Sequence, residues 1–385
     1  MRILKMGQVG GGIGAFIGEV HRKAARMDGG IVLTAGAFDV VPQKSLQQGK
    51  LLGVDPKRVY STYQEMIAGE LALPQEERVD FVAVCTPNHT HFPIAKACLE
   101  AGFNVMCEKP MTLTVEEAEE LAALVKASGK VFGLMHNYTA YPMVKLAKDM
   151  VKQGDLGKLR KVVVQYPQGW LWQLLEKTGN MQASWRTDPK TSGAAGSMGD
   201  IGTHAANLAE YITGLKITKV LSDLTAFVKG RKLDDDGNVL LRFEKGAKGV
   251  LHASQISVGE ENNIAIWIYG EKKALWWRQE NPNELHVLCQ TAPEEVWKRG
   301  NGYVAEKSKA AARCTRIPSG HPEGFLEAFA NNYCNFADTI RAKMDKRKAT
   351  PEELDFPGVT AGVRGMKFIN AVVSSSKKGN VWTAI

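Results

Sequence analysis

The amino-acid sequence predicts an α/β protein of two domains, residues 1–140 and residues 141–385. Three observations lead to this fold class. The chain has 385 residues, and a domain takes roughly 150 residues. In the first 140 residues, short apolar runs alternate with amphipathic stretches, which is typical of a parallel sheet covered on both faces. The later residues form longer runs rich in β-branched and aromatic side chains, which predict a large sheet of meandering antiparallel strands.

The individual elements follow from these patterns. In the first domain, strands are predicted at residues 2–9, 32–38, 81–85, 104–107 and 131–134, and helices at 16–25 and 115–128. In the second, a helix is predicted at 143–153 and strands at 161–166, 220–228, 238–243, 249–257 and 264–270. Helices are also predicted at 325–336 and 351–376, and residues 278–322 are expected to be a long excursion of loops.

Composition excludes several classes of protein. Hydrophobic residues make up 44% of the chain and charged residues 23%, as in ordinary globular proteins. No stretch of about 18 apolar residues predicts a membrane helix. The net charge of +8 is spread along the chain, so no nucleic-acid surface is expected. The six cysteines lack the spacing of a zinc site and no leader peptide is recognised, which favours a reduced, cytoplasmic protein without bound metal.

A glycine cluster follows the first predicted strand. Gly10, Gly12 and Ala15 fit the pattern G-x-G-x-x-A, with Ile13 and Gly14 inside it. Small residues let the backbone turn tightly and approach a pyrophosphate, and the next helix offers free N–H groups to that anion. The sequence therefore predicts a dinucleotide site, although the glycines could simply form a tight turn.

An acidic residue strengthens this prediction. Asp39 ends the second predicted strand, where a carboxylate accepts the ribose hydroxyls of NAD. No basic residue follows it directly, so NAD is preferred over NADP. Lys44 and Lys50 leave some dual specificity open.

Polar segments follow three further strands, where ligands of a parallel sheet collect. Lys109 stands between a strand end and a proline, so its ammonium could bond a substrate oxygen that gains negative charge; a surface lysine is the alternative. Farther on, Asp200 and His204 are four residues apart and would share one face of a helix. The alternative for that pair is a helix cap with a core histidine.

These motifs together, in this order, resemble the glucose-fructose oxidoreductase/inositol dehydrogenase/rhizopine-catabolism (Gfo/Idh/MocA) family. The motifs are the glycine cluster, Thr86-Pro87-Asn88 with His91, Glu108-Lys109-Pro110, and Asp200 with His204. The resemblance implies a Rossmann domain, a C-terminal α+β domain with an open, mostly antiparallel sheet, and a homodimer or homotetramer built through that sheet. It also implies NAD(P)-dependent oxidation of a sugar or cyclitol hydroxyl, with Lys109, Asp200 and His204 as the catalytic set.

The same resemblance guides the assignment of ligand contacts. The expected cofactor residues are Gly10, Gly12, Ile13, Gly14, Asp39, Thr86, Asn88, His91, Glu108, Lys109 and Asn137. Residues 183–189 and 321–324 resemble members that act on sugars or glycosides, such as levoglucosan dehydrogenase and glycoside 3-dehydrogenases. The expected substrate residues are Lys109, Gln168, Trp185, Arg186, Asp200, His204 and His321.

The predicted reaction moves a hydride from a ring carbon of the sugar, expected to be carbon 3, to NAD. His204 would take the hydroxyl proton, since an imidazole has an ordinary pKa of about 6.5. Lys109 would stabilise the developing alkoxide, and Asp200 would orient the ring or the substrate. Three alternatives stay open: an inositol dehydrogenase, a glycosidase that reduces and reoxidises bound NAD, and an NAD-bound regulator without enzymatic activity.

Overall fold

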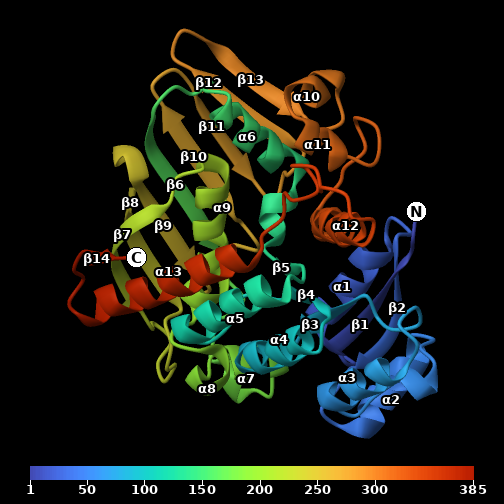
Figure 1. Cartoon of the computed structure of the whole chain (residues 1–385). Coiled ribbons are helices and arrows are strands. Elements are labelled where there is room, and N and C mark those ends of the chain that lie inside the picture. The colour runs from blue at the N-terminus through green and yellow to red at the C-terminus, as the bar shows by residue number, and fades with distance from the viewer. The chain divides into compact units, whose positions relative to one another are not determined.

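The computed structural model describes residues 1–385, which form two compact units (Figure 1). The first unit consists of Met1–Thr112, Glu116–Asn137 and Phe325–Val363, and the second of Leu113–Val115, Tyr138–Gly324 and Arg364–Ile385. The first unit therefore includes residues 325–363, which the sequence analysis assigns to the second domain. We call these parts the first and the second unit throughout.

The first unit contains a parallel five-stranded sheet in the order β2-β1-β3-β4-β5. Its strands are β1 (Leu4–Gly10), β2 (Ile31–Ala37), β3 (Phe81–Cys85), β4 (Asn104–Cys107) and β5 (Phe132–Leu134). Every residue of β3 is buried, as expected for a central parallel strand covered on both faces. All five predicted strands are thus present, with ends shifted by at most two residues.

Helices cover this sheet. They are α1 (Phe16–Arg26), α2 (Pro42–Leu51), α3 (Tyr63–Ala72), α4 (His91–Glu100), α5 (Val115–Ser128) and α12 (Phe325–Met344). Helix α12 packs against α1 and places Phe329, Tyr333 and Phe336 in the apolar core beside Phe81. A segment from late in the sequence therefore completes the core of the first unit.

The second unit contains a nine-stranded sheet in the order β13-β12-β11-β10-β6-β9-β8-β7-β14. Only β6 and β9 pair in parallel, so the predicted mostly antiparallel sheet is confirmed. The strands are β6 (Leu159–Pro167), β7 (Ile217–Thr225), β8 (Asp236–Phe243), β9 (Lys248–Ser254), β10 (Ala265–Gly270), β11 (Ala274–Arg278), β12 (Glu284–Cys289), β13 (Ala292–Lys298) and β14 (Thr383–Ala384).

Two sequence predictions about this unit are wrong. The expected loop excursion at 278–322 contains the strands β12 and β13. Strand β13 lies at the edge of the sheet and has no buried residue, so its sequence has no apolar pattern. The closing helix α13 (Val359–Lys377) begins at Val359 rather than at residue 351. Residues 351–354 form a turn instead.

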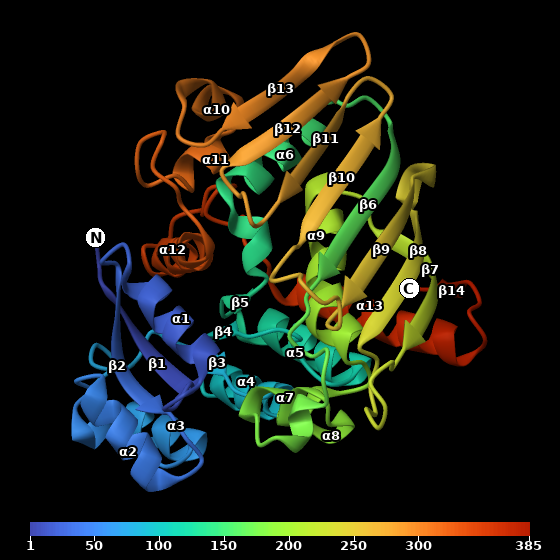
Figure 2. The ribbon, with the colours of Figure 1, turned by 180° about the vertical axis from the view of Figure 1, so that it is seen from behind.

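One face of the nine-stranded sheet carries the main helices of the second unit. Helices α6 (Pro142–Lys152), α9 (Thr203–Thr213) and α13 lie along it (Figure 1). The short helices of this unit are α7 (Met181–Arg186), α8 (Pro189–Ser192), α10 (Gly302–Lys307) and α11 (Lys309–Arg313). Figure 2 shows the opposite face, where no helix stands in front of β10, β6 and β9. No helix of the chain combines the length and the apolar composition that a membrane crossing requires.

Candidate active site

The glycine cluster forms the turn between β1 and α1. Gly10, Gly11 and Gly14 have positive φ values of 82°, 73° and 79°, which glycine adopts without steric cost. A Cβ atom on Gly10 would lie 2.6 Å from the carbonyl oxygen of Cys85, and one on Gly12 would lie 2.9 Å from Oδ2 of Asp39. Larger residues would therefore displace neighbouring groups at both positions.

The start of α1 suits the pyrophosphate of a dinucleotide. No side chain caps the first turn, because Ala15 stands at the N-cap position. The backbone N–H groups there remain available to an anion, and the helix dipole favours negative charge at this end. The residues present thus fit the predicted cofactor.

Asp39 lies beside this turn, two residues beyond the end of β2. Its Oδ1 accepts a hydrogen bond of 2.9 Å from the backbone N–H of Val41. Its Oδ2 faces Gly12. The following Val40 is almost fully exposed and carries no charge. The carboxylate is therefore placed where a ribose diol could bond to it.

Replacing Asp39 with alanine is expected to raise the dissociation constant for NAD about tenfold to a hundredfold. Hydrogen bonds to a charged acceptor contribute about 1.5–3 kcal/mol. The preference for NAD over NADP should also fall, because the carboxylate that repels a 2′-phosphate is gone. Calorimetric titration measures both constants. Asp345→Ala, an exposed aspartate in the same unit, is the control, and unchanged NAD affinity in Asp39→Ala would contradict the assignment.

The loop after β3 is held to the loop after β4 by His91. Its Nε2 lies 2.8 Å from the carbonyl oxygen of Thr86, and its Nδ1 lies 2.7 Å from that of Pro110. The ring is buried, and burial lowers the pKa of His91 although both backbone contacts act to raise it. Thr86 itself packs against Gly10. His91 thus supports the two loops, and its direct contact with the cofactor stays a prediction.

Two buried amides flank these loops. Asn88, in the short turn Asn88–Thr90, and Asn137, after β5, are 6% and 3% exposed. The Nδ2 of Asn137 is buried without a hydrogen-bond partner. Because buried polar groups are nearly always bonded, this amide is suited to hold a ligand at the carboxyl end of the sheet.

Lys109 follows β4 in the segment Glu108-Lys109-Pro110. The buried carboxylate of Glu108 accepts a 3.1 Å hydrogen bond from the backbone N–H of Lys109. His136, after β5, is also buried, and burial together with the charge of Lys109 lowers its pKa to about 3. The surroundings of Lys109 in the first unit thus include the ionised carboxylate of Glu108 and the neutral imidazole of His136.

In the second unit, Asp200 lies in a single π-helical turn, Met198–Gly202, immediately before α9. Such turns are frequent at functional sites. The half-buried carboxylate of Asp234 anchors the start of the turn by accepting hydrogen bonds from the backbone N–H of Gly196 (2.7 Å) and of Met198 (2.8 Å). Asp234 has no local sequence signal, and the sequence analysis missed it.

The carboxylate of Asp200 has two partners from other elements. Its Oδ2 accepts a 2.9 Å hydrogen bond from Nε2 of the buried Gln255 and lies 3.5 Å from Nε of Arg186. The guanidinium of Arg186 stacks on Trp185, with 4.2 Å from Cζ to the ring centroid. The ring centroid of Trp170 lies 6.0 Å from the same Cζ atom of Arg186. This corner combines charged groups with flat apolar rings, as a sugar site requires.

His204 is the second residue of α9 and is buried. Its ring meets Tyr138 edge-on with centroids 4.9 Å apart, and Tyr166 at 6.3 Å. The two tyrosine hydroxyls bond each other, and that of Tyr166 donates to Oδ1 of Asn262 (2.7 Å). The same oxygen accepts a 2.7 Å hydrogen bond from Gln168. Burial, then Tyr138 and Asp200, raise the pKa of Tyr166 well above its usual value, so Tyr166 stays protonated.

The second unit therefore brings together four of the predicted substrate residues. An ion pair joins Asp200 to Arg186, and His204 and Gln168 contact the hydrogen-bonded group of Tyr138, Tyr166 and Asn262. Trp185 joins them through Arg186. His321 does not join them by any such bond. Its side chain is exposed, and its carbonyl oxygen accepts from Arg299. Gln255, Tyr138, Tyr166 and Asn262 complete the cluster and were missed, because their partners are distant in sequence.

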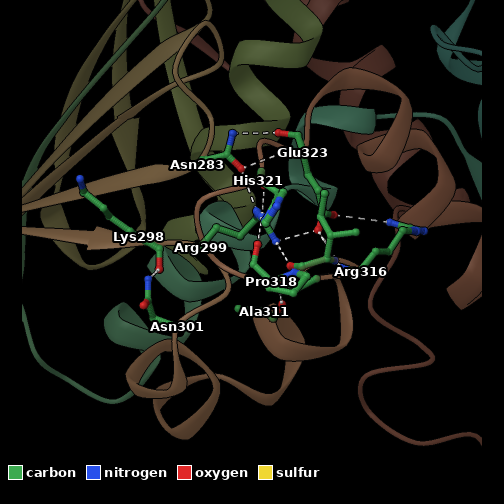
Figure 3. Close-up of polar contacts among 11 residues, drawn as sticks. Asn283, Lys298, Arg299, Asn301, Ala311, Arg316, Pro318, His321 and Glu323 are labelled. Atoms are coloured by element: carbon green, nitrogen blue, oxygen red, sulfur yellow. Dashed lines mark hydrogen bonds and ion pairs between the residues drawn. The ribbon is translucent and has the colours of Figure 1, made fainter.

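A buried ion pair joins the two ends of the segment 299–323 (Figure 3). Arg299 and Glu323 have side chains 2% exposed and lie 2.7 Å apart. Arg299 also donates to Asn283 (2.8 Å) and to the carbonyl of Ile317 (2.9 Å). This bracing fixes Pro322 and Gly324 at a shallow pocket of about 560 Å³. Its lining is Glu261, Asn262, Gln279, Glu280, Pro282, Asn283, Pro322, Glu323 and Gly324.

Comparison with known proteins covers both units. Residues 5–136 match the family described as "Oxidoreductase family, NAD-binding Rossmann fold", and residues 144–276 match "GFO/IDH/MocA C-terminal domain". YfiI, an uncharacterized oxidoreductase of Bacillus subtilis, is 35% identical over 382 residues, which are 98% of this chain and 96% of YfiI. Levoglucosan dehydrogenase of Pseudarthrobacter phenanthrenivorans is 28% identical over 323 residues, 78% of this chain and 79% of that protein. An inositol dehydrogenase homolog from Azotobacter vinelandii, solved with NAD+, has a TM-score of 0.95 at 35% identity and covers 100% of this chain and 98% of its own.

Proposed function

Because this chain belongs to the GFO/IDH/MocA family of oxidoreductases, we propose that it oxidises a ring CH–OH group of a sugar or glycoside, at carbon 3. The chain is an NAD-dependent sugar or cyclitol dehydrogenase by its family. The finer proposal rests on one observation: Asp200 and His204 stand with the stacked Arg186–Trp185 pair around one polar and aromatic corner. Such a corner suits a pyranose ring, which offers hydroxyls at its rim and apolar faces.

In the proposed mechanism, bound NAD would supply the hydride acceptor for the ring carbon. The first-turn N–H groups of α1 and the carboxylate of Asp39 would hold it. An imidazole nitrogen of His204 takes the proton of the substrate hydroxyl. Nζ of Lys109 donates a hydrogen bond to the oxygen as negative charge develops there. Asp200, fixed by Gln255, orients the substrate hydroxyl.

A second candidate is an inositol dehydrogenase. The specific observation in its favour is the 35% identity to a homolog from Azotobacter vinelandii that was solved with NADH and myo-inositol. Inositol shares the hydroxyl-bearing six-membered ring of a sugar, so the same residues could act on it. The two candidates differ in the substrate that is oxidised fastest.

A substrate panel tests the proposal. Purified protein is mixed with NAD and with methyl glucosides, glucose, levoglucosan, myo-inositol or glucose 6-phosphate, and the absorbance of reduced nicotinamide is followed. We expect the highest kcat/KM with a neutral sugar or glycoside, and a 3-keto product by NMR.

Each other result has a defined meaning. Fastest turnover of myo-inositol would establish the second candidate. Cleavage of a glycoside without accumulation of NADH would indicate a redox-cycling glycosidase. Absence of NAD reduction with every compound would contradict the proposed function. The variant His204→Asn, inactive under the proposal, shows whether any NADH arises from this site.

We also propose a homo-oligomer formed through the open face of the second sheet. On this face, Trp267, Trp276 and His286 stand side by side on three neighbouring strands. The rings of Trp276 and His286 stack with centroids 3.8 Å apart. Broad aromatic surfaces of this kind are typical of protein interfaces.

A further inference from the structure

Three buried side chains form a continuous hydrogen-bonded chain inside the first unit. The hydroxyl of Tyr333 lies 2.6 Å from Nδ1 of His21, and Nε2 of His21 lies 2.8 Å from Oε1 of Glu108. The side chain of His21 is 0% exposed and that of Glu108 is 9% exposed. We call this the Tyr333–His21–Glu108 chain. Burying three polar groups is costly unless they satisfy one another, so the arrangement constrains all three side chains.

The Tyr333–His21–Glu108 chain joins three separate elements of the fold. His21 belongs to α1, Glu108 follows β4, and Tyr333 belongs to α12, 312 positions from His21. The ring of His21 is also held edge-on by Phe329, with centroids 5.3 Å apart. The imidazole therefore has little freedom to rotate away from Glu108.

The Tyr333–His21–Glu108 chain of hydrogen bonds ends at the backbone of Lys109. Oε2 of Glu108 accepts a 3.1 Å hydrogen bond from the N–H of Lys109. On the other side of Lys109, the carbonyl oxygen of Pro110 lies 2.7 Å from Nδ1 of His91. Two buried histidines thus hold the residues before and after Lys109, one directly and one through a carboxylate.

The charges are arranged consistently with this geometry. Burial by itself would lower the pKa of His21, but Cys85, Tyr333 and Glu108 raise it well above its usual value. Burial would raise the pKa of Glu108, but the bond from His21 and the charges of His21, Lys109 and His91 lower it. Glu108 therefore stays ionised at neutral pH and accepts the hydrogen bond from Nε2 of His21.

We propose that His21 and Tyr333 are positioning residues for Lys109, acting through Glu108. They fix the carboxylate, the carboxylate fixes the backbone of Lys109, and the ammonium then stays where it can meet the substrate oxygen. The inference rests on the proposed catalytic role of Lys109. It adds a connection from two helices to that role, which neither the family match nor the mechanism above contains.

Steady-state kinetics of four variants test this, with NAD and the panel compound that is oxidised fastest. His21→Gln should lower kcat about tenfold to a hundredfold, because small displacements of a catalytic group are costly. The dissociation constant for NAD and KM should change less than kcat does, since His21 touches neither ligand directly. Tyr333→Phe removes one hydroxyl and should lower kcat less. In the double variant with Lys109→Met, His21→Gln should cause no further loss.

The matched control is Phe336→Leu. Phe336 lies three residues after Tyr333 on α12 and packs on Phe81 with centroids 5.2 Å apart, outside the chain. This variant should lower Tm and leave kcat unchanged. If His21→Gln also lowers only Tm, the positioning role is overturned while the proposed function stands. The positioning role is also overturned if His21→Gln lowers kcat by the same factor in the Lys109→Met background as in the wild type. If Lys109→Met alone keeps full kcat, the proposed role of Lys109 fails instead.

A readout without turnover completes the test. Lysines are reductively methylated with 13C, and the methyl signal of Lys109 is assigned by its loss in Lys109→Met. His21→Gln should shift this signal, whereas Phe336→Leu should not. An unmoved signal in His21→Gln would contradict the inference even if no substrate had been found.

Discussion

Replacing His204 with asparagine is expected to lower kcat by a factor of about 10²–10⁴, which is the usual contribution of a general base. Asparagine has a similar shape and can still donate a hydrogen bond, but it cannot take a proton near neutral pH. His204 is buried beside Tyr138 and Tyr166. Since Tyr166 stays protonated, that hydroxyl cannot serve as the base in its place.

The affinity for NAD should be nearly unchanged in this variant, because His204 is expected to act on the substrate alone. Stopped-flow mixing separates the hydride-transfer step from product release, and calorimetry measures NAD binding. His252→Asn, a histidine on β9 bonded only to Asn238, is the matched control and should keep wild-type kcat. Retention of wild-type hydride transfer by His204→Asn would remove His204 from the mechanism.

Replacing Lys109 with methionine is expected to lower kcat by about 10²–10³, as the loss of one oxyanion donor does. Methionine keeps much of the length of the side chain and removes the charge. Lys109→Arg should restore only part of the rate, because the planar guanidinium presents its donors in a different geometry. The backbone bond from Lys109 to Glu108 persists in both variants, so their loss of rate reports on the side chain.

Lys126→Met is the control for this experiment, since Lys126 is an exposed lysine on α5. The deuterium isotope effect on kcat adds a second measurement. It should rise in Lys109→Met as hydride transfer becomes slower than product release. Wild-type kcat together with an unchanged isotope effect would show that the ammonium does not touch the reacting oxygen.

Much of the fold could be predicted because its signals are local. The strands of the first unit are short apolar runs, and β3 and β4 match the predicted bounds. The glycine turn is equally local, since the positive φ values of Gly10 and Gly14 arise within a few residues. By contrast, β13 lies at a sheet edge and is nearly all exposed, so it has no apolar pattern to recognise.

The predicted site residues were those that stand in compact motifs, such as Glu108-Lys109-Pro110. The residues that hold them were missed because their partners lie far away in the sequence. Gln255 reaches Asp200 across 55 positions. Tyr333 reaches His21 across 312. No periodicity or spacing encodes such pairs, which exist only once the chain has folded.

The return of α12 to the first unit has a consequence for synthesis on the ribosome. Residues 138–324, most of the second unit, are made between the sheet of the first unit and the helix that completes it. At about 5–20 residues per second, this interval is about 9–37 s. During it, Phe81 lacks its packing partners Tyr333 and Phe336. The nascent cofactor-binding half must therefore remain incomplete, with apolar surface available to chaperones, until nearly the whole polypeptide has been translated.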